Sequence, residues 1–325
     1  MAVLATSAAT SGLAAHAAPA ADTTPPTPDQ LIDALNGTFG RHAGARGSHA
    51  KGQCVVGQFE PGAELRRLVP ATLFMKPVLD ATLRLSIGGG NPKVSDKSRT
   101  VRGLSLRVAD GGETWDLVMI SEPAFFAATP ESFVSFLQAR VPDPASKKPD
   151  PEKIAAHNAR FPDGKIQPSL LAAHAAPASY ATTPYFANHA FRFVDKTGHG
   201  SWARIVAEPV AGTQYLDAAA EAALPDEFLD GELKRRLARG PIEFTLVAQH
   251  PGPADSLTDS SQVWAGNGQR TPLGRLRITA LGDNAQCDSM IFVPTQLPPG
   301  IEPSDDPILK ARAAAYAVSF GRRQR

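Results

Sequence analysis

The feature that most constrains this fold is a set of short segments in which apolar and polar residues alternate. Leu83, Leu85 and Ile87 alternate with Arg84 and Ser86. A period of two is that of a β-strand with two different faces, so the polar residues are expected to face solvent or a cavity. Related alternations or apolar runs occupy residues 54–59, 104–108, 115–120, 191–193, 201–207, 242–250 and 276–281. The sequence therefore predicts about eight strands.

Helical spacing appears in segments that interrupt or follow these strands. Residues 27–30 (Thr-Pro-Asp-Gln) have the form of a capping box, and apolar residues follow at helical intervals to residue 39. Further helices are expected at residues 131–139, 152–160, 226–238 and 305–323. Because strands and helices do not alternate one to one, the pattern fits a barrel better than a parallel βαβ sheet. We predict an α+β fold, a β-barrel with helical insertions.

The first residues differ in composition from the rest of the chain. Residues 1–22 are rich in Ala, Ser and Thr and contain Ala-x-Ala sequences, although no Lys or Arg precedes Arg41. We expect residues 1–26 to be a signal-peptide-like or disordered segment and residues 27–325 to form one domain. This favours a periplasmic or secreted location, with a cytoplasmic one as the alternative.

Charge and cysteine content exclude several classes of protein. The net charge of +1 gives no case for a nucleic-acid partner, and no apolar run reaches the roughly 18 residues of a membrane span. The two cysteines, Cys54 and Cys287, form no zinc pattern. We interpret them as two buried thiols, with a disulfide between them left open.

A glycine-flanked basic loop at residues 46–52 (Arg-Gly-Ser-His-Ala-Lys-Gly) presents one histidine, His49, just before an apolar run. Arg46 and Lys51 are expected to lower the pKa of His49 and keep it neutral near pH 7, where it can act as a base. Taken alone, an incidental loop histidine is the commoner explanation.

The last predicted helix holds the second candidate. Arg312 and Tyr316 are four residues apart, so the guanidinium is expected to lie over the phenol. A neighbouring cation and a metal both favour the phenolate form. Leu309, Ala313, Tyr316 and Phe320 are expected on the inner face, and Arg323 returns to the face of Tyr316. Taken alone, an ordinary amphipathic helix is the commoner explanation.

Together, the two segments resemble the two haem motifs of the haem catalases. Arg46-x-x-His49-Ala-Lys-Gly is similar to the distal motif. Residues 298–302 (Pro-Pro-Gly-Ile-Glu) followed by Arg312-x-x-x-Tyr316 are similar to the proximal motif. The resemblance covers roughly residues 28–325, with intermediate matches at 76–86, 100–108, 116–126 and 188–191.

The resemblance implies an eight-stranded antiparallel barrel with surrounding helices and one bound haem b. It implies Tyr316 as axial ligand of the iron. The other implied roles surround the haem: His49 is the catalytic base oriented by Ser86, Phe133 lies over the haem, Arg46, Arg84 and Arg323 bind propionates, and Arg312 stabilises the phenolate with support from His189 and Asp306.

Some residues depart from the family pattern. Ile120 replaces the distal asparagine and cannot hydrogen-bond a peroxide, and Ser121 is the next candidate for that role. Thr100 replaces an acidic residue of the access channel, and Ser48 replaces a valine beside His49. We therefore expect a wider or less polarised channel. The match is to a minimal barrel core, as in the small catalase-related peroxidases.

The expected function is a haem peroxidase that reduces hydrogen peroxide or organic hydroperoxides with an organic electron donor, has weak catalase activity and detoxifies peroxide. An alternative is an enzyme that rearranges lipid hydroperoxides, like the allene oxide synthase relatives. A non-enzymatic haem carrier or sensor and a haem-free barrel are the remaining alternatives. We expect a monomer or a homodimer with no integral membrane segment.

Overall fold

Nine strands form one antiparallel sheet in the computed structural model, which describes residues 24–325. The strands are β1 (Gly52–Pro61), β2 (Leu79–Ile87), β3 (Arg102–Asp110), β4 (Glu113–Ile120), β5 (Tyr185–Val194), β6 (Gly200–Pro209), β7 (Ile242–Gln249), β8 (Arg270–Leu281) and β9 (Ile301–Pro303). The predicted strands are all present, and β8 begins several residues earlier than the pattern indicated.

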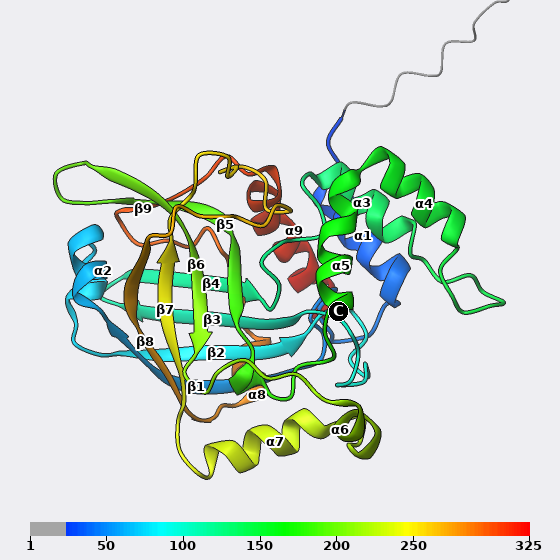
Figure 1. Ribbon diagram of the computed structural model, residues 1–325, viewed down its shortest axis with the longest axis horizontal. Helices are drawn as coiled ribbons and strands as arrows, with labels where there is room; N and C mark the ends of the chain where they lie inside the picture. Colours follow the sequence, from blue (N-terminus) through cyan, green and yellow to red (C-terminus); the bar gives the residue numbers. More distant parts are fainter. Residues whose placement is uncertain (1–23) are drawn as a thin grey trace, which may run out of the picture.

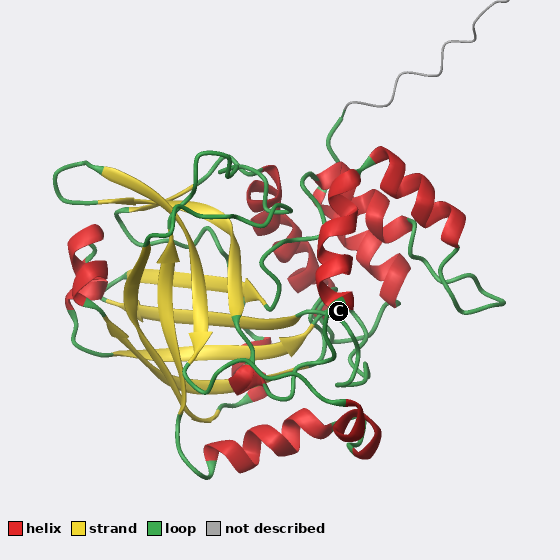
Figure 2. Cartoon of the chain, viewed as in Figure 1, coloured by secondary structure: helices red, strands yellow, loops and turns green. Residues whose placement is uncertain are grey.

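The sheet closes into an eight-stranded barrel (Figure 2). Its order is β4-β3-β2-β1-β8-β7-β6-β5, and a pairing of Ile120 in β4 with Phe186 in β5 joins the two ends. The short strand β9 adds to the outside of β5. The predicted antiparallel barrel is therefore confirmed.

Alternation along the strands divides the barrel wall into two faces. Leu83 and Leu85 of β2 are fully buried and belong to the same core cluster as apolar residues of β5–β8, so they face the barrel interior. The residues between them, Arg84 and Ser86, line a cavity outside the barrel. Antiparallel pairing aligns Ser86 with Gly103, and Gly103 with Ile120, in one row across β2, β3 and β4.

Helices cover this outer face at one end of the barrel (Figure 1). α1 packs against α3 and α9, and α3 also contacts α4. The helices are α1 (Pro28–Phe39), α2 (Ala63–Leu68), α3 (Pro130–Gln138), α4 (Pro151–Arg160), α5 (Ile166–Ala172), α6 (Ala218–Ala223), α7 (Phe228–Leu237), α8 (Asn284–Asp288) and α9 (Pro307–Arg323). The capping box of α1 forms as predicted, between Thr27 and Gln30.

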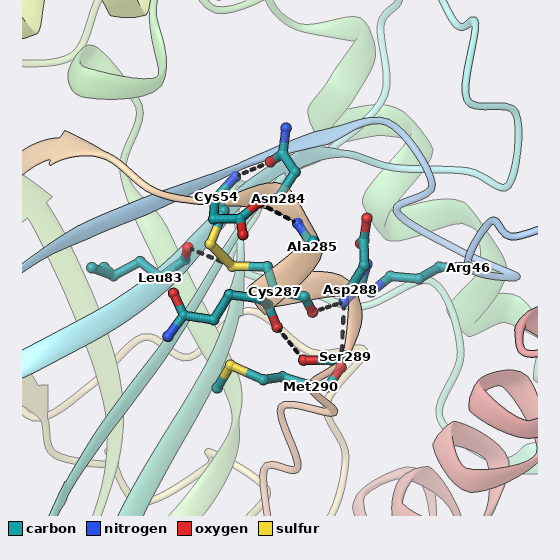
Figure 3. The surroundings of a disulfide bond; sticks show 11 residues. Arg46, Cys54, Leu83, Asn284, Ala285, Cys287, Asp288, Ser289 and Met290 are labelled. Carbon is teal, nitrogen blue, oxygen red and sulfur yellow. Dashed lines mark hydrogen bonds and ion pairs between the residues drawn. A yellow bond between two sulfur atoms is a disulfide. The ribbon is translucent and has the colours of Figure 1, made fainter.

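The interpretation of Cys54 and Cys287 as two unpaired thiols is wrong. Cys54 in β1 and Cys287 in α8 form a disulfide with a sulfur–sulfur distance of 2.04 Å (Figure 3). The backbone N–H of Cys54 also donates to the side chain of Asn284, the first residue of α8. The sequence did not indicate this proximity, because the cysteines are 233 positions apart and α8 returns to the barrel only after all eight strands are complete.

Two sequence predictions concern the ends and the surroundings of the domain. The predicted signal-like segment lies mostly outside the described residues, and residues 24–26 precede α1. No helix within residues 24–325 is both long and apolar enough to cross a membrane.

Candidate active site

A cavity of about 570 Å³ lies between the outer face of β2–β4 and the helices α1, α3, α5 and α9. His49, on the loop before β1, and Tyr316, on α9, both line it although 267 residues separate them in the sequence. Its volume is within the range typical of cofactor and ligand sites, and its lining is mostly apolar. The two candidates predicted independently from the sequence therefore share one site.

His49 is held in a backbone conformation that most residues avoid. Its φ angle is +54°, in the left-handed region, where a non-glycine residue points to a functional constraint. Its Nδ1 lies 3.0 Å from Oγ of Ser86. The opposing residue is Gly103, where a Cβ atom would come within 2.5 Å of that hydroxyl and 2.7 Å of Nδ1 of His49. The absence of a side chain at Gly103 thus leaves room for the pair.

Surrounding arginines add to the effect of burial on this histidine. Burial first, and then the charges of Arg84, Arg312 and Arg46, lower the pKa of His49 to about 3. The predicted lowering is confirmed, but Lys51 takes no part because it pairs with Asp96 at 2.7 Å. With Nδ1 engaged by the serine, Nε2 of a neutral His49 is left to accept a proton from a molecule in the cavity.

Four side chains form a chain of hydrogen bonds on the opposite side of the cavity. Nε and Nη2 of Arg312 both donate to the phenolic oxygen of Tyr316, at 2.9 and 2.5 Å. Nη1 of Arg312 donates to Nε2 of His189, 2.9 Å away. Nδ1 of His189 donates to Oδ2 of Asp306 at 2.7 Å. This arrangement places His189 and Asp306 behind the arginine, as the resemblance implied.

Burial and hydrogen bonding set the charges of His189 and Asp306 in this chain of hydrogen bonds. Burial lowers the pKa of His189, which stays neutral and can therefore accept from the guanidinium. Burial raises the pKa of Asp306, but hydrogen bonds from His189 and from the start of α9 outweigh it, and the net shift is downward. Oδ1 of Asp306 accepts from the backbone N–H of Ile308 at 2.8 Å, so one carboxylate caps α9 and orients the chain of hydrogen bonds. The phenolic oxygen of Tyr316 is thus held by two donated hydrogen bonds from one guanidinium.

Arg46, Arg84 and Arg323 form a basic cluster at the cavity wall, as predicted. Burial and then the charge of Arg46 lower the pKa of Arg84 to about 9 and that of Arg323 to about 10. The segment around α8 holds two of the three. Arg46 pairs with Asp288 and donates to the carbonyl of Cys287 at 2.6 Å (Figure 3). Arg323 donates to the carbonyl of Asp288 at 2.9 Å.

The remaining predicted residues also reach the cavity, with one exception. Ile120, Phe133, Thr100 and Ser48 all line it. Ser121 does not, and its hydroxyl accepts from the backbone N–H of Arg102 at 2.9 Å. Ser121 is therefore not placed to replace the hydrogen bond that Ile120 lacks.

The residues present fit a haem. Nε of Arg323 is buried without a hydrogen-bond partner among the described residues, which is what a missing anionic group would leave. Tyr316 presents one oxygen that could bind an iron, and the small residues Ala311 and Ala315 of α9 leave space for a flat group against the helix. The phenylalanines at 126 and 133 stack with ring centroids 5.1 Å apart and give the cavity an aromatic wall.

Three residues of this site were not identified from the sequence. Gly103 carries no chemical group, and only strand pairing reveals that it opposes Ser86. Asp288 and Cys287 were missed because α8 has five residues, too few for a periodic pattern. The two acidic residues at the ends of this segment, Asp283 and Asp288, are its only sequence signal.

The sequence of this chain is similar to those of known proteins. Residues 30–324 match the sequence family described as Catalase. A catalase-related peroxidase from Synechococcus elongatus is 34% identical over 302 residues, which are 92% of this chain and 89% of the relative. A catalase-related peroxidase from Mycolicibacterium paratuberculosis is 35% identical over 298 residues, which are 90% and 93% of the two chains.

Solved structures show the same fold. Catalase A from Saccharomyces cerevisiae superposes with a TM-score of 0.78 at 22% identity, over 90% of this chain and 64% of that one. A fungal catalase superposes with a TM-score of 0.77 at 21% identity, over 87% and 60%. The chain thus spans less than two thirds of the length of these solved catalases.

Proposed function

The chain belongs to the catalase family, and we propose that it is a haem b-dependent peroxidase. In this proposal it reduces hydrogen peroxide and organic hydroperoxides with an organic electron donor, and so removes peroxides. The observation that carries the proposal is one cavity with a neutral, serine-oriented histidine on one side and an arginine-supported tyrosine on the other. A binding protein needs no such acid–base pair.

Each cofactor contact is assigned to a residue of this chain. Tyr316 would hold the iron, and Arg312 would orient the phenol oxygen through two donated hydrogen bonds, with His189 and Asp306 fixing the arginine. The basic cluster of Arg46, Arg84 and Arg323 would pair with the two propionates, and Phe133 would lie against the ring. When bound, the haem supplies the redox-active iron.

His49 carries the proton chemistry. Because its pKa is about 3, the imidazole is neutral at physiological pH and Nε2 can accept the proton of a hydroperoxide. The same nitrogen can return that proton to the departing oxygen as the O–O bond breaks. Ser86 holds Nδ1 and therefore sets the direction in which Nε2 points.

Ile120 supports a peroxidase in preference to a strong catalase. It lies in the same strand row as Ser86 and Gly103, where a hydrogen-bonding side chain would position a second peroxide molecule. Loss of one positioning hydrogen bond commonly costs on the order of 10²-fold in rate. We therefore expect weak disproportionation of hydrogen peroxide and dominant oxidation of an external donor.

Reconstitution with haem tests the proposal. The wild-type protein should develop a Soret band and reduce peroxide with a phenolic donor. Tyr316→Phe should lose the ligand-dependent spectrum, whereas Tyr215→Phe, which changes an exposed tyrosine outside the cavity, should keep it. A Tyr316→Phe spectrum identical to wild type, or peroxide turnover no faster than that of free haem, contradicts the proposal.

We also propose a periplasmic or secreted location, with the cytoplasm as the alternative. The Cys54–Cys287 disulfide supports it because disulfides persist mainly in oxidising compartments. Fractionation of the source cells tests this proposal, and recovery in the cytosol with both thiols free contradicts it. A monomeric or homodimeric state is proposed with it and is measured by light scattering of the haem-loaded protein.

A further inference from the structure

The charged residues that line the cavity are all of one sign. They are Arg46, Arg84, Arg99, Arg312 and Arg323, and no Asp, Glu or Lys side chain lines it within the described part of the chain. Three of these arginines form the basic cluster and Arg312 serves the tyrosine. Arg99 is the one that the proposed haem site does not use.

Arg99 differs from the other four in its surroundings. It is exposed and yet contributes to the cavity lining, so it lies at the rim. Within residues 24–325 its side chain has no hydrogen bond or ion pair, whereas each of the other four arginines has at least one acceptor. Its charge is therefore available to a molecule that enters.

The backbone that carries Arg99 is held firmly. The guanidinium of Arg102 is fully buried and donates to the carbonyls of Ser98 at 3.1 Å and Thr100 at 2.7 Å, on either side of Arg99. It also donates to the carbonyl of Asp96 at 2.5 Å. The rim segment is thus fixed from beneath, and Arg99 projects from a constrained backbone, which reduces the entropic cost of binding a partner.

Neighbouring cations are already neutralised. Lys51 pairs with Asp96 at 2.7 Å, and Lys97 pairs with Asp226 at 3.4 Å while donating to two carbonyls of the 221–224 segment. Within residues 24–325, no carboxylate that lines the cavity competes for Arg99. Among the charged side chains that line the cavity in the described part of the chain, Arg99 is therefore the one without a partner.

Apart from these arginines, His49 and several uncharged polar residues, the cavity lining is apolar. Val101 lies beside Thr100, and Ile120, Phe125, Phe126 and Leu171 continue the wall towards the helices. A molecule that contacts both Arg99 at the rim and the apolar lining has an apolar body and an anionic end.

From this juxtaposition we propose that Arg99 binds the carboxylate of an organic hydroperoxide with a long apolar chain, such as a fatty-acid hydroperoxide, and selects it over uncharged peroxides. The inference rests on the proposed peroxidase function and names its substrate class. Arg99 is a specificity-determining residue in this proposal, and His49 and Tyr316 keep their assigned roles. Salt screens the attraction between an anionic group and an exposed guanidinium. The preference for the anionic hydroperoxide over uncharged peroxides should therefore fall as ionic strength rises.

The test compares an acid and its ester in the haem-loaded protein. The substrates are a hydroperoxide of linoleic acid, the methyl ester of that hydroperoxide, and hydrogen peroxide. Arg99→Gln should lower kcat/KM for the acid by roughly threefold to tenfold, as one exposed charge pair allows. The ester and hydrogen peroxide should change by less than about twofold. Arg275→Gln, which alters an exposed β8 arginine that does not line the cavity, is the matched control.

Binding of linoleate, which is not a peroxide, gives a readout that needs no turnover. Its dissociation constant should rise for Arg99→Gln by the same factor as kcat/KM falls and should stay unchanged for Arg275→Gln. Equal effects on acid and ester, or no effect on linoleate binding, overturn the assignment of Arg99. If the wild type binds linoleate through Arg99 but reduces no peroxide, the proposed peroxidase function fails while the anion site stands.

Discussion

The disulfide between β1 and α8 offers a test of how the barrel is fastened to the basic cluster. Replacing both cysteines with alanine removes the link without burying a serine hydroxyl, which would lack a partner because Cys54 and Cys287 are 0% and 1% exposed. In the chain-entropy description, a closed loop of 233 residues corresponds to roughly 5 kcal/mol of unfolding free energy, at the top of the usual range. We expect a loss of about 3–5 kcal/mol.

The same substitution should weaken cofactor retention. The carbonyls of Cys287 and Asp288 accept hydrogen bonds from Arg46 and Arg323, at 2.6 and 2.9 Å. Once α8 is no longer linked to β1, these acceptors are less firmly placed and the two guanidiniums lose part of their orientation. We expect haem to leave the double variant roughly threefold to tenfold faster, since hydrogen bonds to charged groups contribute about 1.5–3 kcal/mol when fully lost.

Urea unfolding of the haem-free protein, followed by circular dichroism, measures the first effect, and haem transfer to an acceptor globin measures the second. Wild-type protein reduced with a thiol is the matched control, because it lacks only the link. An unchanged unfolding midpoint at equal m-value refutes the structural role of the disulfide. A lowered midpoint with unchanged haem transfer refutes the connection between α8 and the basic cluster.

Three further predictions concern the histidine side of the cavity. Gly103→Ala places a methyl group 2.5 Å from Oγ of Ser86 and should lower peroxidase kcat/KM on the order of 10²-fold, with the Soret band retained. The control is Gly37→Ala, whose added methyl group meets nothing within 4 Å and should leave kcat/KM unchanged. Ile120→Asn should raise the catalase turnover number, up to about 10²-fold, in oxygen-evolution assays; an unchanged rate argues against the role given to this position. The pKa of His49 is about 3 in the folded protein, below its unfolded value of 6.5, so kcat/KM for peroxide should stay constant from pH 8 to about pH 4. The stability that this group contributes should decline as pH falls from 6.5 towards 3. A decrease in kcat/KM with a midpoint near pH 6.5 contradicts the assignment.

The strands were predictable because their signal is local. Leu83 and Leu85 face the barrel core while Arg84 and Ser86 face the cavity, so the alternation is visible between adjacent residues of the sequence. The helices α1 and α9 were predicted from their caps and spacing, but Ala313 and Phe320, expected on the inner face of α9, do not line the cavity. Short helices such as α8 were not, because one turn carries no period.

The parts of the site that escaped prediction depend on pairing between distant segments. The position of Gly103 opposite Ser86 follows from strand register, which the sequence does not state. The lowered pKa of His49 was anticipated, yet Arg84 supplies the effect expected from Lys51, because Lys51 turns to Asp96. The geometry of Tyr316, Arg312 and His189 matches the resemblance, and their roles stay predictions until a haem-loaded protein is measured.

The row of paired positions through Ser86, Gly103 and Ile120 also bears on how such a site can change during evolution. A single-residue insertion in β2 or β3 would shift the register and turn every cavity-facing side chain towards the barrel core. Insertions should therefore be excluded from these strands, while substitutions at Ile120 leave the register intact. The exposed side chain of Arg99, in the segment between β2 and β3, lies outside the row, so a substitution there leaves the register intact. Substrate choice can thus diversify at the rim while the arrangement that handles the proton is preserved.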